Sequence, residues 1–396
     1  MTTMNNPDSS TNTYHDTSFD TLLPYLSASD VCTLWVADEN ALHVLKQLPI
    51  QKTTRLFLLT NRYDIFTTAK EKNINATFND FDFSQLDIPD DLLVTRVIYR
   101  ISKEKAVAHH IFYETNQLLS KTVSSTIKNK KIPELVISGK KQEGIKSYQK
   151  HLIQTYQCQG QLKKNGTNYH GIFSGFRLTE EQEKSTPKTA TPANISTYHN
   201  IHTIDADENN RNEEITTPKK AYTKAGIFGW NKIDKGSELL LRSLSGIMAS
   251  MTPKPQSILD LGCGYGWIFL NLPHYLHTTT STHLSITATD NNAAAILCAQ
   301  KNSIDLPFSV HVIADDCAKN IKERFDLILC NPPFHQGFSH DKSLTLKFLE
   351  QTKKHLKTNG MAIFVVNEFI QLPYNDWFSS QKVIVKEQGF KVLTLS

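Results

Sequence analysis

The chain has 396 residues, of which 39% are hydrophobic and 21% are charged, and its net charge is +4. This composition excludes disordered and fibrous proteins, and the length exceeds what one hydrophobic core usually serves, so two domains are expected. The sequence lacks a run of the roughly 20 apolar residues that a membrane-spanning helix requires, and its polar start lacks the apolar core of a signal peptide. A cytoplasmic location is therefore expected.

The mildly basic charge is compatible with a polyanionic partner, but it does not require one. Six cysteines are scattered along the chain without a CxxC pair. We interpret them as reduced and mostly buried packing residues. Because a zinc site would require closely spaced Cys or His pairs, no metal is expected.

In chain order, apolar runs at 31–38, 55–60, 92–100 and 134–139 alternate with helical stretches. This alternation predicts an α/β layered domain with a largely parallel sheet, which we place at residues 18–176. None of the four runs is followed by a glycine-rich turn. The N-terminal domain is therefore expected to lack a cofactor site.

Residues 177–220 are rich in Thr, Asn, Glu and Pro, contain few large apolar side chains and show no sustained periodicity. Such a composition does not support a packed core. We interpret the segment as a polar linker or a long surface insertion.

The most basic stretch of the chain precedes this segment. It contains Lys121, Lys128, Lys130, Lys131, Lys140 and Lys141. Contact with nucleic-acid phosphates is one hypothesis for these lysines, and an ordinary solvated surface is the alternative.

Residues 221–396 show a sharper pattern of alternating elements. Helices are predicted at 237–248, 292–301 and 344–356, and strands at 257–261, 284–290, 309–316, 325–330, 361–367, 383–385 and 390–395. The last two strands are close enough in sequence to form a hairpin. The pattern predicts a seven-stranded doubly wound sheet with one antiparallel edge.

A glycine-rich turn follows the first of these strands. It consists of Asp260, Gly262, Cys263, Gly264 and Gly266 with the residues between them. Glycine permits positive φ and lets a ligand touch the backbone, and the following helix offers free N–H donors. A GxGxG pattern alone could also be a tight turn, and a dinucleotide fingerprint has the spacing GxGxxG. Asp260 favours another ligand, because a carboxylate can accept from the ammonium of a methionine moiety and would repel a pyrophosphate.

Acidic residues end the next two strands. Asp290, with Asn291 beside it, stands where an acid can bind both hydroxyls of a ribose, although it could instead cap the following helix. Asp315 and Asp316 close the third strand, and either could bind the amino group of an adenine. Together with the glycine turn, these acids fit S-adenosylmethionine better than a nicotinamide or ATP.

The motif Asn331-Pro332-Pro333-Phe334 follows the fourth predicted strand, at the edge where open α/β sheets bind ligands. The side-chain oxygen of Asn331 and the carbonyl of Pro332 could accept both protons of an exocyclic amine, and the prolines would stiffen the loop. Phe334 could stack on an extruded base. A proline-rich loop after a strand is the structural alternative. His335 could contact substrate or relay a proton, or be an ordinary loop histidine.

These motifs resemble those of class I methyltransferases that act on base amines, and the wider layout is similar to the ribosomal RNA small subunit methyltransferase C family. The matching stretches are 226–241, 259–266, 325–338, 365–374 and 389–393, and more faintly 134–152. The resemblance implies two tandem Rossmann-like methyltransferase domains, of which the N-terminal one is degenerate. It also implies methylation of a guanine N2 in 16S ribosomal RNA of the 30S subunit, and a monomer is expected.

Position by position, the resemblance assigns cofactor roles to Gly262, Gly264 and Asp290 and the catalytic loop to residues 331–334. It further matches Asp234, Gly236 and Ser237 to a conserved stretch that lies against the cofactor in the family. The chain departs from the family in the length of residues 177–220. The sequence NPPFHQ also occurs in the related large-subunit guanine-N2 enzymes, so 23S ribosomal RNA is an alternative substrate.

Other substrate classes also fit the motif. A glutamine amide presents the same NH₂ geometry, so a protein glutamine methyltransferase of the release-factor type is an alternative, and a DNA amino-methyltransferase is another. Both kinds usually carry Tyr at the position of Phe334. A non-catalytic RNA-binding protein is a further alternative, but the intact Asp260, Asp290 and Asn331 argue against it.

Overall fold

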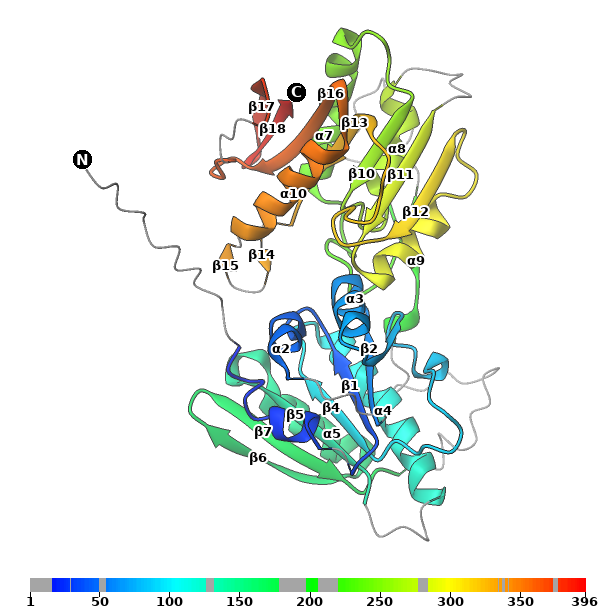
Figure 1. Ribbon diagram of the computed structural model, residues 1–396, viewed down its shortest axis with the longest axis vertical. Helices are drawn as coiled ribbons and strands as arrows, with labels where there is room; N and C mark the ends of the chain where they lie inside the picture. Colours follow the sequence, from blue (N-terminus) through cyan, green and yellow to red (C-terminus); the bar gives the residue numbers. More distant parts are fainter. Residues whose placement is uncertain are drawn as a thin grey trace, which may run out of the picture.

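The computed structural model consists of two lobes, one above the other in Figure 1. The described residues are 16–28, 30–49, 55–125, 132–177, 197–205, 220–276, 284–333, 335–336, 339–340, 342–372 and 377–396. Each lobe is built on a seven-stranded sheet.

The N-terminal sheet has the strand order β3-β2-β1-β4-β5-β7-β6. Its strands are β1 Thr33–Ala37, β2 Leu56–Thr60, β3 Asn75–Phe78, β4 Arg96–Arg100, β5 Glu134–Lys140, β6 Gln159–Asn165 and β7 Asn168–Ser174. The helical segments of this lobe are α1 Leu23–Leu26, α2 Ala41–Gln47, α3 Tyr63–Glu71, η1 Phe83–Gln85, α4 Lys105–Ser125, η2 Lys141–Glu143 and α5 Ile145–Tyr156. The first five strands are parallel, and β6 and β7 form an antiparallel hairpin at the edge.

The C-terminal sheet repeats this order as β12-β11-β10-β13-β16-β18-β17. Its strands are β10 Ser257–Leu261, β11 Ser285–Asp290, β12 Ser309–Ala314, β13 Phe325–Cys330, β16 Leu356–Asn367, β17 Gln381–Glu387 and β18 Phe390–Leu395. Its helices are α7 Lys235–Ser250, α8 Trp267–Leu276, α9 Ala293–Asn302 and α10 Lys342–His355. Two short pairs complete the fold: β8 His202–Ile204 with β9 Ala221–Thr223, and β14 His335–Gln336 with β15 Ser339–His340. The shared strand order confirms two tandem Rossmann-like units and the doubly wound seven-stranded sheet.

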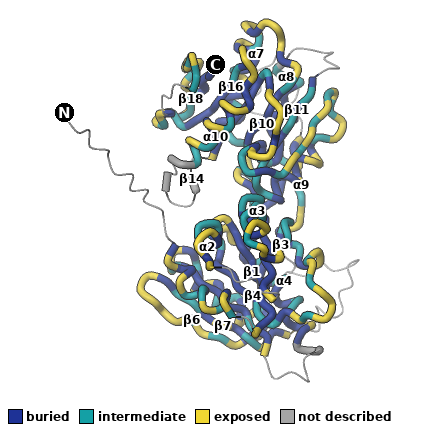
Figure 2. Tube along the Cα trace, viewed as in Figure 1, coloured by how far each residue is buried: buried dark blue, intermediate teal, exposed yellow. Residues whose placement is uncertain are grey.

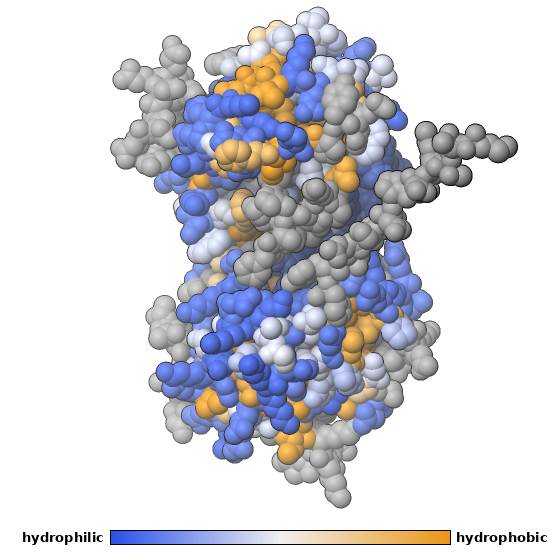
Figure 3. Space-filling model, turned by 90° about the vertical axis from the view of Figure 1, so that its left-hand side faces the viewer, coloured by the Kyte–Doolittle hydropathy of each residue, from blue (hydrophilic) through white to orange (hydrophobic). Residues whose placement is uncertain are grey.

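The central strands of each sheet are the most buried part of each lobe, as the dark tubes of Figure 2 show. Parallel strands carry helices on both faces and so bury both sets of alternating side chains. Ile258 accordingly packs in one apolar cluster of the C-terminal lobe, while its neighbours Leu259 and Leu261 pack in another. Hydrophilic residues predominate on the face drawn in Figure 3. The six cysteines are free, and five of them are buried.

A buried ion-pair network stands at the end of β4, the N-terminal counterpart of β13. Arg100 is 3% exposed. Its Nε lies 2.8 Å from a carboxylate oxygen of Asp16, and its Nη2 lies 2.6 Å from one of Glu143. After β1, Asp38 accepts from the Asn40 backbone N–H, and no glycine turn is present there. Charged side chains that pair with one another therefore stand at the carboxyl ends of β1 and β4. This arrangement agrees with a degenerate N-terminal domain.

Part of the predicted linker is packed against the lobes. Residues 197–205 are described, and Tyr198 within them is 0% exposed. The strand β8 that follows pairs with β9. The remaining linker residues up to 219 lie outside the described part of the chain. Among the described helices, none has both the length and the apolarity to cross a membrane.

Candidate functional site

The turn after β10 requires glycine at three positions. Gly262, Gly264 and Gly266 have φ values of +78°, +56° and +91°, a region that other residues adopt at a cost. A Cβ on Gly266 would lie 2.1 Å from the ring of Phe269, whereas a Cβ on Gly264 would meet no described atom within 4 Å. The turn therefore packs tightly at Gly266 and leaves its backbone open at Gly264.

Asp260 carries a buried carboxylate beside this turn. The residue is 1% exposed, and neither carboxylate oxygen has a hydrogen-bond partner with good geometry among the described residues. Burial raises the pKa of Asp260 to about 7; the nearby N–H of Phe269 lowers it and Asp290 raises it further. A buried carboxylate without a partner is costly unless a cation pairs with it. The site thus suits a ligand with a positively charged donor group.

Asp290 fastens the glycine turn to the end of β11. Its two carboxylate oxygens accept from the backbone N–H groups of Gly264 and Asn292, each at 2.9 Å. The alternative role as helix cap falls to Asn292, whose side-chain oxygen accepts from Ala294 at the start of α9. Asp290 is therefore placed beside the open backbone of Gly264.

Asn291 faces the N-terminal lobe instead of the glycine turn. Its backbone oxygen accepts from the N–H of Tyr63, and its side-chain oxygen accepts from the N–H of Asp64, both at 2.9 Å. The N–H of Ala293 donates to the carbonyl of Asn61 at 2.8 Å. The start of α3 therefore docks against the start of α9, and the two helices lie side by side in Figure 1.

Arg62 brings a positive charge to this contact, where its Nε lies 3.8 Å from a carboxylate oxygen of Asp64. Its side chain is 19% exposed. Burial lowers the pKa of its guanidinium, but the negative charges of Asp64, Glu39, Asp290 and Asp316 raise that pKa above its usual value. Sequence reasoning did not identify Arg62, because its acidic neighbours in the C-terminal lobe are far away along the chain. The N-terminal lobe thus places a cation next to the predicted ribose-binding acid.

The two acids after β12 have different surroundings. Asp315 is 1% exposed, and its carboxylate accepts from the N–H groups of Asp316 and Asn320 and from the Asn320 side chain. Asp316 instead pairs with Lys347 of α10. Asp315 thus stabilises its own turn, and Asp316 is the acid of the two that faces outward.

Asn331 is held by two residues at the start of α7. Its side-chain nitrogen donates to a carboxylate oxygen of Asp234 at 2.7 Å and to the hydroxyl of Ser237 at 2.9 Å. Asp234 is also the N-cap of α7, accepting from the N–H of Ser237. Because a carboxylate only accepts, the amide nitrogen of Asn331 must face Asp234. Its carbonyl oxygen is consequently directed away from this pair.

The rest of the loop is described in part. Pro332 is buried and Pro333 is exposed. Phe334 lies outside the described residues, and His335 is described only as backbone of β14. Gly236 is closely packed, because a Cβ there would lie 3.2 Å from the ring of Phe390. The buried thiol of Cys263 has a pKa well above its usual value because of burial, so Cys263 serves the packing of the turn.

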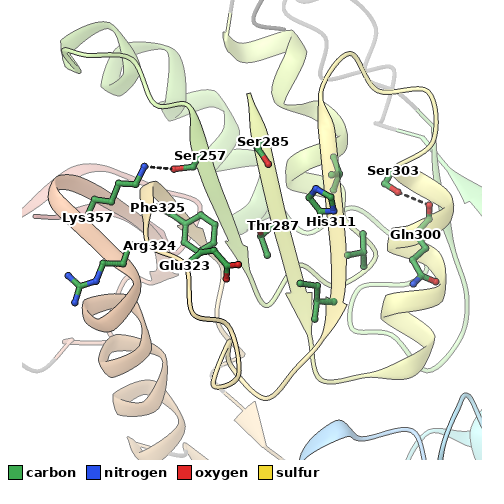
Figure 4. A pocket seen from close by; sticks show the side chains of 13 residues that line it. Ser257, Ser285, Thr287, Gln300, Ser303, His311, Glu323, Arg324, Phe325 and Lys357 are labelled. Atoms are coloured by element: carbon green, nitrogen blue, oxygen red, sulfur yellow. Dashed lines mark hydrogen bonds between the residues drawn. The ribbon is translucent and has the colours of Figure 1, made fainter. Parts of the chain in front are cut away.

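A cavity of about 720 Å³ lies elsewhere on the C-terminal sheet (Figure 4). Ser257 and Ser285, at the starts of β10 and β11, line one end of it. The chain between β12 and β13 contains turns and no helix, so this face of the sheet is open. The glycine turn lies at the carboxyl ends of the same strands, so the cavity and the site are distinct.

Comparison with known proteins agrees with this geometry. The methyltransferase small domain family matches residues 219–394. Ribosomal RNA small subunit methyltransferase C of Marinomonas sp. is 32% identical over 171 residues, covering 42% of this chain and 47% of the relative. The enzyme of that name from Actinobacillus succinogenes is 24% identical over 348 residues, covering 87% of this chain and 89% of the relative. In the more similar matches, the chain spans about half the length of its relatives.

The likeness extends to the fold of both lobes. The T. thermophilus 16S rRNA N2 methyltransferase RsmC, solved with AdoMet and guanosine, aligns with a TM-score of 0.70 at 18% identity, covering 97% of this chain and 92% of the other. Residues 219–394 therefore match the methyltransferase small domain family, and over most of its length the chain is similar to ribosomal RNA small subunit methyltransferase C.

Proposed function

We propose that the chain transfers a methyl group from S-adenosylmethionine to the exocyclic N2 amine of a guanine in 16S ribosomal RNA. The orientation of Asn331 is the observation that carries this proposal. Asp234 and Ser237 bind its NH₂ group, so its carbonyl oxygen is available as an acceptor at the end of β13. The names of the relatives, and the guanosine in the T. thermophilus complex, support the same substrate class.

The residues around the glycine turn fit S-adenosylmethionine. The unpartnered carboxylate of Asp260 would accept from the ammonium of the methionine moiety, and Asp290 beside Gly264 would accept from the ribose hydroxyls. Asp316 would face the adenine, with Gly262, Cys263 and Gly266 shaping the turn. When bound, this cofactor supplies an electrophilic methyl group.

The chain's own part in the reaction is to hold the amine. The lone pair of an exocyclic amine is delocalised into the base, so the nitrogen is a weak nucleophile. Two acceptors, the Asn331 side chain and the Pro332 carbonyl, would bind both N–H protons and direct the lone pair toward the methyl group. Because Asn331 is already hydrogen-bonded and Pro332 is rigid, little reorganisation would be needed. The stacking role of Phe334 and the proton relay through His335 remain predictions.

If the substrate is ribosomal RNA, the basic stretch of the N-terminal lobe is the candidate surface for contact with RNA phosphates. Lys121 and Lys141 are exposed, and Lys140 is half-buried. The other members of the basic stretch, Lys128, Lys130 and Lys131, lie outside the described residues. We propose that this stretch contacts RNA.

We further propose that the protein acts as a cytoplasmic monomer. Residues 18–176 and 221–396 would be its two domains, joined by residues 177–220.

The test is radiolabelled methyl transfer from S-adenosylmethionine to four acceptors: 30S subunits, naked 16S RNA, 50S subunits and release factor. We expect label in 16S RNA, either naked or in the subunit. Label in 50S subunits would instead indicate a 23S enzyme, and label in release factor a glutamine methyltransferase. Absence of label from all four, with folded protein and bound cofactor, would favour a non-catalytic RNA-binding protein.

A further inference from the structure

Three potential metal ligands meet on the N-terminal lobe, away from the cofactor site. His110 and Glu114 stand one turn apart on α4, on the same face of the helix. His199 joins them from the short helix Thr197–His199 in the segment between the lobes. One ligand atom of each residue lies within 4.8 Å of those of the other two. The cluster is therefore compact enough for one ion after small side-chain adjustments.

His110 is prepared as a ligand by its surroundings. The residue is 0% exposed, and its Nε2 lies 2.9 Å from the backbone oxygen of Phe81. Since a carbonyl can only accept, Nε2 must carry the proton, which leaves a lone pair on Nδ1. That buried Nδ1 has no hydrogen-bond partner among the described residues. Metal-bound histidines usually donate their other N–H to such a carbonyl.

The charges around the cluster favour a cation. Burial raises the pKa of Glu114 to about 7, and the nearby Asp82 raises it further. A divalent ion would offset the repulsion between these carboxylates. Among the lysines nearby, Lys121 lowers the pKa of Glu114. Lys224 is paired with Asp80 and lies over the ring of Tyr198, 3.8 Å from its centre. Its positive charge is thus already balanced by a partner of its own.

We propose that His110, Glu114 and His199 bind a divalent transition-metal ion such as Zn²⁺. Two imidazoles and one carboxylate are a common donor set for zinc, with the remaining position open to water. Exposure of His199 gives the ion a path from solvent. Sequence spacing did not predict this site, because His199 is far along the chain from the two ligands on α4.

Such an ion would fasten the connection between the lobes. Residues 197–199 lie against α4, and the following strand β8 pairs with β9. Tyr222 of β9 in turn exchanges hydrogen bonds with Asn302 at the end of α9. A metal at His199 would therefore tie α4 to a segment that reaches the C-terminal lobe.

The test uses the full chain after dialysis against a chelator and then against buffer without it. Zn²⁺ binding is measured by calorimetry, and Co²⁺ binding by its visible absorption, which reports imidazole and carboxylate ligation. The variants are Glu114→Gln, which keeps the side-chain shape, and His199→Ala, at an exposed position. His311→Ala, at an exposed histidine of β12, is the matched control, and circular dichroism verifies the fold of each variant.

We expect one equivalent of Zn²⁺ and of Co²⁺ to bind. Each of the two cluster variants should weaken binding by at least about tenfold, and His311→Ala should leave it unchanged. Absence of stoichiometric binding would overturn the proposal. So would unchanged affinity in both cluster variants, or an equal loss in the His311 control, which would indicate adventitious binding to surface histidines.

Discussion

Replacement of Asp260 by Asn tests whether its buried carboxylate is the binding group for a cationic ligand. In the free protein the pKa of this group is raised from 3.8 to about 7, mainly by burial. Between these two pH values the folded state holds a proton that the unfolded state has lost. The free energy of unfolding therefore falls as pH rises through this window. Three pKa units correspond to a total on the order of 4 kcal/mol.

Asp260→Asn removes this titration while keeping the side-chain shape. The free energy of unfolding of the variant, minus that of the native chain, should increase by about 3 kcal/mol between pH 5 and pH 8. Urea unfolding of the ligand-free proteins at both pH values measures this difference. A pH-independent effect of the amide cancels in the comparison.

The same substitution should weaken binding of S-adenosylmethionine. Loss of a hydrogen bond to a charged group costs about 1.5–3 kcal/mol, which corresponds to a roughly 10- to 100-fold higher Kd by calorimetry. Asp315→Asn is the control. The Asp315 carboxylate is also buried, but it accepts three hydrogen bonds and should stabilise the fold, so its replacement should lower the free energy of unfolding. A stability difference for Asp260→Asn that does not change with pH, together with unaltered cofactor affinity, would refute the reasoning.

Further predictions concern the loop, its support and the glycine turn. Asn331→Ala should abolish turnover and leave cofactor affinity nearly intact, because the side-chain oxygen is proposed to bind the substrate amine and not the cofactor; an equal loss of calorimetric affinity would contradict this role. Asp234→Ala should lower kcat more than it raises KM, since it removes the acceptor that holds the Asn331 amide, and unchanged steady-state kinetics would argue against such positioning. Gly266→Ala should lower the free energy of unfolding by about 1–3 kcal/mol, because its Cβ would overlap the ring of Phe269; a thermal melt unchanged from native would show that the turn relaxes freely.

Apolar runs identified the parallel strands except β3, because strands buried on both faces are nearly continuous in hydrophobic residues. Only one residue of β3 is buried, so this edge strand shows no such run. The edge hairpin of β6 and β7 was missed for a related reason. Most of β6 is exposed and polar, so it shows no buried face in the sequence. Its two-residue loop, Gly166-Thr167, with Gly166 at φ +60°, is the one local signal that could have indicated a hairpin. The predicted strand at 92–100 begins only at Arg96.

The site was predictable where its residues follow one another along the chain. The glycine turn and the acids at strand ends are local features, and parallel strands bring their carboxyl ends to one edge. The direction of the Asn331 amide could not be predicted, because it depends on Asp234 and Ser237 of another element. The backbone bridge between Arg62 and Asn292 was equally hidden, since it depends on how the two lobes dock.

The most direct test of the central claim identifies the methylated nucleoside. 16S RNA that lacks the modification is incubated with the protein and S-adenosylmethionine, digested to nucleosides and analysed by mass spectrometry. The account predicts N2-methylguanosine as the product with the native chain and none with Asn331→Ala. A methylated ribose or ring nitrogen, or equal product from the variant, would contradict the claim that Asn331 and Pro332 hold an exocyclic amine.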